Sequence, residues 1–167
     1  MDRPRLSFRQ VNRRGTPGHD PGLQKHHLLP VGLLRRPSLK RFFDHLDCQA
    51  DGLDDFRANG LLLPCRERTV LRLGLPLHRG PHPRYSELVW QRVGQIEREF
   101  SQLAERRSHP PREHAVMRLG LLQRALRRRL LSQKRPLALH ARDPLGQARD
   151  FSKIDRMAET WWAATEV

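Results

Sequence analysis

One apolar face of a long helix is the strongest structural signal in this 167-residue chain. After Gly80 and Pro81, apolar side chains recur at steps of three and four, which is the spacing of one face of an α-helix. They are Tyr85, Leu88, Val89, Val93, Ile96, Phe100 and Leu103. The pattern predicts a helix over about residues 83–106, and such a helix must bury its apolar face against another element.

A second apolar series follows the break at Pro110 and Pro111 and predicts a helix that ends near Ser132. Its members are Val116, Leu119, Leu122, Leu126 and Leu130. The opposite face carries the arginine run 127–129, which would either follow a nucleic-acid backbone or simply face solvent. A further short helix is expected over residues 151–163, ending in two tryptophans.

The segment before the first long helix predicts a small hairpin. The chain should be extended from Gln24 to Val31, and residues 37–46 read as a short helix with proline at its start. Asn59 and Gly60 form a turn signal because both residues tolerate positive φ, and residues 61–63 behind them read as a short buried strand. We therefore expect two strands separated by a helical loop.

The charge of the chain points to an acidic partner. Lys and Arg total 32 against 18 Asp and Glu, which gives a formal net charge of +14. Most of the excess is arginine, whose planar guanidinium suits phosphate oxygens. An arginine-rich composition inherited from a GC-rich genome is the alternative explanation of this charge.

The cysteines and the N-terminus exclude two classes of protein. Cys48 and Cys65 have no CxxC partner, so a cysteine-based zinc clamp is excluded. A disulfide between them is an open alternative to two reduced thiols, and we expect the reduced form. The start of the chain has no apolar signal core, and no stretch approaches the roughly 18 apolar residues that span a bilayer. We expect no membrane insertion, and either a cytoplasmic protein or one delivered to a target cell without a classical signal peptide.

Histidines supply the candidate metal ligands. His26 and His27 are adjacent, and on an extended segment their side chains point to opposite sides, so one can hold a metal while the other faces a substrate. His78 and His82 stand four residues apart, a spacing that lets both reach one ion. With His26 they would form a three-nitrogen site with positions left open for water and phosphate. Taken alone, the pair of adjacent histidines would more often be a surface feature.

The order of these motifs resembles a known family. His26–His27, then Asn59–Pro64, then His78–Tyr85 is similar to the AHH nuclease family, which belongs to the HNH and endonuclease VII superfamily. The resemblance covers about residues 22–100. It implies a core of a two-stranded hairpin and a helix that together hold one metal ion. The chain departs from the family at Lys25, where the family has alanine.

The resemblance also implies roles for single residues. His26, His78 and His82 match the metal ligands of the family. The catalytic pair would be His27, matching the general base, and Asn59, matching the asparagine that braces the loop and orients the base. The metal would be Zn²⁺, Mg²⁺, Mn²⁺ or Ni²⁺, since imidazole suits transition metals while related nucleases use Mg²⁺.

Three arginines near these motifs are weaker candidates for binding nucleic acid. They are Arg57, Arg79 and Arg84. A guanidinium can donate two hydrogen bonds to one phosphate, although these side chains could equally be solvent-exposed arginines that bind no ligand.

Together these features predict an α+β fold. It would be mainly helical, with a small ββα-metal (HNH-like) hairpin–helix core and a C-terminal helical extension. Residues 1–21, which mix arginines with prolines and glycines, would be a flexible basic arm. Residues 22–106 would form the nuclease core, and residues 107–167 would form a helical extension packed on or beside it.

The expected function is a metal-dependent endonuclease that hydrolyses DNA with little sequence specificity. One alternative is a non-catalytic nucleic-acid-binding protein whose histidine-held metal is structural, and another is an RNase that uses the same site. The AHH family, which this chain resembles, includes bacterial toxin nucleases. The resemblance therefore also implies that the chain could be a toxin that an acidic immunity or inhibitor protein binds and inhibits.

Overall fold

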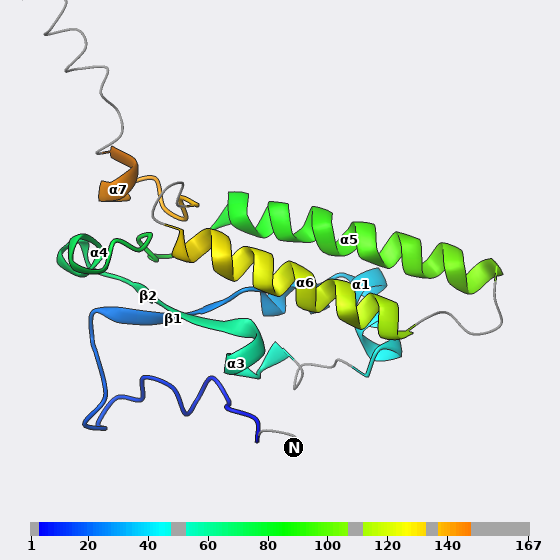
Figure 1. The fold of residues 1–167 in the computed structure, drawn as a ribbon, viewed down its shortest axis with the longest axis horizontal. Coiled ribbons are helices and arrows are strands. Elements are labelled where there is room, and N and C mark those ends of the chain that lie inside the picture. Colours follow the sequence, from blue (N-terminus) through cyan, green and yellow to red (C-terminus); the bar gives the residue numbers. More distant parts are fainter. Residues whose placement is uncertain (1–3, 48–52, 107–111, 133–136, 148–167) are drawn as a thin grey trace, which may run out of the picture.

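The computed structural model describes residues 4–47, 53–106, 112–132 and 137–147. Its elements follow one another along the chain and are drawn in Figure 1. They are β1 (Leu23–His27), η1 (Val31–Arg35), α1 (Pro37–His45), α3 (Phe56–Asn59), β2 (Gly60–Pro64), α4 (Glu67–Leu73), α5 (Pro83–Arg106), α6 (Arg112–Leu131) and α7 (Pro144–Gln147). The predicted α+β class, mainly helical with a small sheet, is confirmed.

The sheet is the expected two-stranded antiparallel hairpin. Its register pairs Leu23 with Pro64 at one end and His27 with Gly60 at the other, and η1, α1 and α3 occupy the long connection between the strands. The first strand is shorter than predicted because it ends at His27. The Leu28 amide then donates to the Asn59 carbonyl (2.8 Å), and η1 begins just after Pro30.

Asn59 and Gly60 do not form the predicted positive-φ turn. Asn59 is the last residue of α3, and Gly60 is extended, with φ of −107°. Glycine is required there for space, since a Cβ built on Gly60 would lie 2.1 Å from the Phe56 ring. The sequence therefore indicated correctly that the second strand begins beside this glycine, but the predicted positive-φ turn was wrong.

The two long helices lie side by side over the hairpin (Figure 1). The helix predicted over residues 83–106 is confirmed as α5, and the second apolar series lies within α6. Residues of the hairpin region, α1, α5 and α6 contribute to one hydrophobic cluster. Members from these four parts include Leu63, Phe42, Val89 and Leu126. Helix α6 thus shares its core with α5, and no helix of the described part is long and apolar enough to cross a membrane.

The basic segment at the N-terminus differs from the expected flexible arm. From Pro4 onward it packs against the hairpin: Phe8 is 6% exposed, and the Phe56 amide donates to the Leu6 carbonyl (2.7 Å). Further along, the Asn12 side-chain amide donates to the carbonyls of Asp20 and Leu23. One buried aromatic ring and these hydrogen bonds order a segment whose composition predicts mobility.

Some expectations lie outside the described residues. The helix predicted over residues 151–163 is one, and Cys48 is another. Cys65 is a free, half-buried thiol in the described part of the chain.

Candidate metal centre

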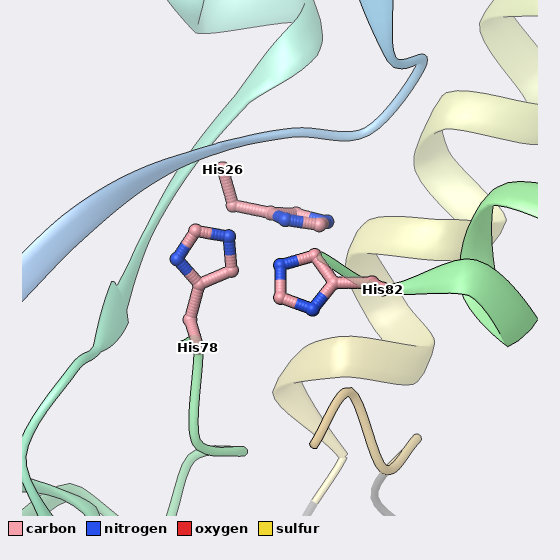
Figure 2. A group of neighbouring side chains, drawn as sticks. All are labelled: His26, His78 and His82. Atoms are coloured by element: carbon pink, nitrogen blue, oxygen red, sulfur yellow. The ribbon is translucent and has the colours of Figure 1, made fainter. Parts of the chain in front are cut away.

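Three histidine rings lie close together, one from β1 and two from the segment just before α5 (Figure 2). The ring centroids are 4.8 Å apart for His26 and His78, 4.5 Å for His78 and His82, and 5.6 Å for His26 and His82. One candidate ligand atom from each ring lies within 4.8 Å of the other two. The three histidines proposed as ligands from the sequence therefore come together.

Backbone hydrogen bonds hold each histidine in place. His26 lies on β1 with its side chain 3% exposed, opposite Leu61 in the register. The His78 amide donates to the Pro64 carbonyl at the end of β2 (2.7 Å), which fixes the loop between α4 and α5. His82 directly precedes α5, and its carbonyl accepts from the Ser86 amide (2.9 Å). The hairpin thus carries one candidate ligand, and the segment between α4 and α5 carries the other two.

Burial keeps these rings neutral. Desolvation is the main cause that lowers the pKa of His26 from 6.5 to about 3, and the neighbouring histidines lower it further. Desolvation also lowers the pKa of His78 to about 4, and it lowers that of His82 in the same direction. A neutral imidazole keeps a lone pair for a metal, so the site is prepared for binding at neutral pH.

The donor set fits a divalent transition metal. Within the described residues, two buried imidazole nitrogens, His26 Nε2 and His78 Nδ1, have no hydrogen-bond partner, which is costly unless an ion or water satisfies the cluster. No carboxylate or thiolate of the described part joins the three histidines. Three imidazoles leave coordination positions open, as catalytic rather than structural metal sites do.

His27 lies apart from this cluster, as the alternation of side chains along β1 requires. Its ring stacks on that of Phe8, with centroids 3.7 Å apart and an interplanar angle of 3°. Burial lowers its pKa, with an opposing effect from Asp54 and a smaller lowering effect from Lys25. His27 is therefore a neutral, half-buried imidazole at neutral pH, able to accept a proton.

Asn59 braces the chain just after His27. Its side chain is fully buried; the amide nitrogen donates to the carbonyls of Leu29 (3.0 Å) and Leu53 (2.9 Å), and its oxygen accepts from the Leu29 amide (2.7 Å). None of these side-chain hydrogen bonds goes to the three clustered histidines. The geometry thus suits a positioning role rather than direct chemistry.

Tyr85 links the helix to the same stretch of backbone. Its hydroxyl donates to the Leu28 carbonyl (2.8 Å), and its ring meets the His26 ring edge-on at 4.8 Å. Burial raises the pKa of this hydroxyl, so it remains a donor at any working pH. The α5 helix therefore fixes both the His26 ring and the backbone beyond His27.

Lys25, which stands where the family has alanine, has a defined contact. Its ammonium donates to the Phe8 carbonyl (2.8 Å), which helps to hold the Phe8 ring against His27. The sequence reasoning did not find Phe8, because a single aromatic residue in an arginine-rich, glycine-rich segment gives no periodic signal.

The arginines named from the sequence are all exposed. The Arg57 guanidinium donates to the Pro4 carbonyl (2.8 Å), so it is partly used within the fold. Arg79 lines a hollow of about 420 Å³ together with Arg66 and Arg68, next to the loop that carries His78. Arg84 lies in the first turn of α5. Arg66 and Arg68 are basic residues near the site that the motif spacing did not indicate.

One known protein family matches most of the chain. A family model described as AHH, a nuclease family of the HNH/ENDO VII superfamily with conserved AHH, matches residues 7–126. The chain belongs to this AHH nuclease family. No curated protein and no solved structure matches the chain. Membership implies a hydrolase that acts on phosphodiester bonds, and the match begins within the N-terminal segment that carries Phe8.

Proposed function

We propose that this AHH nuclease is a metal-dependent endonuclease that hydrolyses DNA with little sequence specificity. The observation that carries the proposal is the convergence of His26, His78 and His82 beside a separate neutral histidine, His27. The three clustered histidines would hold one divalent ion, of the kind Zn²⁺, Mn²⁺, Ni²⁺ or Mg²⁺. When bound, such an ion would neutralise charge on the phosphate and stabilise the leaving oxygen.

His27 would act as the general base. A neutral imidazole can take the proton from the attacking water, which typically contributes about 10² to 10⁴-fold to the rate. The Phe8 ring covers one face of His27 and limits the directions in which it can turn. Asn59 and Tyr85 hold the backbone of Leu28 and Leu29 immediately after it, which fixes the direction of the strand end.

Exposed arginines would bind the phosphates on either side of the cleaved bond. Arg79 is next to a metal ligand in sequence and shares a hollow with Arg66 and Arg68, so it is the best placed of the three arginines named from the sequence. Arg84 lies in the first turn of α5, whereas Arg57 already donates to the Pro4 carbonyl. The +14 net charge favours a polyanion, and it would equally suit an acidic inhibitor protein if the nuclease acts as a toxin.

The test combines metal removal with two substrates. Purified protein stripped by a chelator is incubated with supercoiled plasmid or with RNA, and Zn²⁺, Mn²⁺, Ni²⁺ and Mg²⁺ are added back separately. The proposal predicts plasmid cleavage that disappears with the chelator and returns with at least one metal. His82→Ala should lose this activity, while His114→Ala, which changes an exposed histidine on α6, should keep it.

Two outcomes would contradict the proposal. Metal and nucleic acid binding without cleavage of either substrate would identify a binding protein with a structural metal. Cleavage of RNA but not of plasmid would identify an RNase.

A further inference from the structure

A segment beyond the matched residues contacts the candidate metal centre. The His82 Nδ1 atom lies 3.2 Å from the Leu139 carbonyl oxygen. A carbonyl oxygen can only accept a hydrogen bond, so His82 must carry its proton on Nδ1 in this contact. The lone pair of the neutral ring then lies on Nε2. Leu139 is itself buried, with 6% exposure, which makes its carbonyl a fixed acceptor.

The same segment holds the loop that carries His78. Asp143 is 3% exposed, and its Oδ2 atom accepts from the amide of Leu77 (2.9 Å), the residue directly before His78. Its Oδ1 atom accepts from the Leu145 amide at the start of α7 (3.0 Å). Capping of α7 accounts for the second bond but not for the first, which spans 66 residues.

We infer that residues 139–145 form an outer layer of the metal centre, in which Leu139 and Asp143 are positioning residues for His82 and His78. The family match ends at residue 126, so nothing in the family description assigns these residues a role. Helix α7 also contacts α4, and both helices lie at the same end of the molecule in Figure 1. The inference rests on the proposed function in so far as the three histidines hold a metal.

The physical basis is the orientation of imidazole ligands. A metal-binding histidine usually donates its other N–H to a fixed acceptor, which sets the tautomer and the ring direction. Loss of such an outer partner typically costs about 10 to 100-fold in metal affinity. Leu139 gives His82 this acceptor directly, and Asp143 acts on His78 through the backbone of Leu77.

Cobalt titration of the full chain tests the role of Asp143. Co²⁺ reports its ligand geometry through visible absorption, so affinity and geometry are read in one experiment. Asp143→Ala should weaken binding roughly 10 to 100-fold and change the absorption bands. Asp143→Asn, which keeps one acceptor oxygen, should fall between Asp143→Ala and the unchanged protein.

The matched control is Asp20→Ala. Asp20 also accepts a hydrogen bond from a backbone amide in a loop, that of Gly22 (2.7 Å), and its other oxygen pairs with Arg72 rather than with a residue of the histidine cluster. Its removal should leave cobalt affinity within about twofold, with circular dichroism confirming that both alanine variants are folded. A folded Asp143→Ala protein with unchanged affinity and spectrum would overturn the role of Asp143.

Nitrogen NMR of the metal-free, unsubstituted protein tests the contact of Leu139 without any variant. Above pH 7.5, His82 should be the Nδ1–H tautomer, whereas free histidine favours the other nitrogen. An Nε2–H tautomer would overturn the inference. If the unsubstituted protein binds no Co²⁺, the proposed metal site fails, and the tautomer of His82 still decides whether this segment positions it.

Discussion

The Phe8 ring lies parallel to the His27 ring, with centroids 3.7 Å apart and planes that differ by 3°. Phe8 is in turn held by the Lys25 ammonium at its carbonyl and by the Phe56 ring edge-on at 5.0 Å. The N-terminal segment therefore fixes the ring that we propose as the general base. Lys25, which stands where the family motif has alanine, thus contributes to this arrangement.

Phe8→Leu should slow DNA cleavage roughly tenfold, since leucine keeps most of the apolar volume but not the flat surface that orients His27. Metal affinity should not change, because the Phe8 ring stacks on His27, whose side chain lies apart from the three clustered histidines. Phe42→Leu is the control: it changes an aromatic residue packed between α1 and α5, and folded protein should retain its rate. Equal rates for Phe8→Leu and the unsubstituted protein would remove Phe8 from the catalytic arrangement.

Asn59→Ala should lower the free energy of unfolding by about 3 kcal/mol, because the Leu29 amide and two carbonyls would remain buried without a partner. Denaturant titration measures this loss. Gln123→Ala removes only a 3.3 Å contact to the same side chain and should cost less than about 1 kcal/mol. A similar small loss for Asn59→Ala would mean that this amide does not brace the segment after His27.

The metal-free protein should lose stability as the pH falls below about 6.5. The pKa of His26 is about 3 and that of His78 about 4 in the folded chain, against 6.5 when unfolded. Between these pH values the unfolded chain binds protons that the folded chain does not. The contribution of the two neutral imidazoles to the free energy of unfolding is therefore fully present above pH 6.5 and decreases as the pH falls towards 4. Urea titration from pH 8 to 4.5 measures it.

The control for this pH dependence is His78→Gln, whose amide does not titrate. The urea concentration at the midpoint of its unfolding should decrease less steeply between pH 8 and pH 4.5 than that of the unsubstituted protein. If both proteins respond identically to pH, burial of these imidazoles does not contribute to acid sensitivity.

The features that sequence reasoning captured depend on local patterns. The periodic apolar residues predicted both ends of α5 correctly. The spacing of His26, His78 and His82 predicted a cluster, and the three rings lie together in the structure. The Asn59–Gly60 pair marked a position that requires glycine, but glycine is required because of the Phe56 ring and not because of a positive φ. Short-range signals thus identify a position more reliably than its physical cause.

The features that it missed depend on contacts between distant residues. Phe8 and His27 are 19 residues apart in the sequence, and Asp143 and Leu77 are 66 residues apart. Neither residue belongs to a motif or to a periodic face. Only the folded chain shows that a segment with the composition of a mobile arm is ordered by one buried ring.

The proposed mechanism depends on the division of roles between His26 and His27. Metal affinity and DNA cleavage measured in parallel for His26→Ala and His27→Ala test this division. His26→Ala should weaken metal binding, since its buried ring is one of the three proposed ligands. His27→Ala should bind metal as tightly as the unsubstituted protein and lose cleavage by about 10²-fold or more. Equal losses of metal affinity in both variants, or undiminished cleavage by His27→Ala, would contradict it.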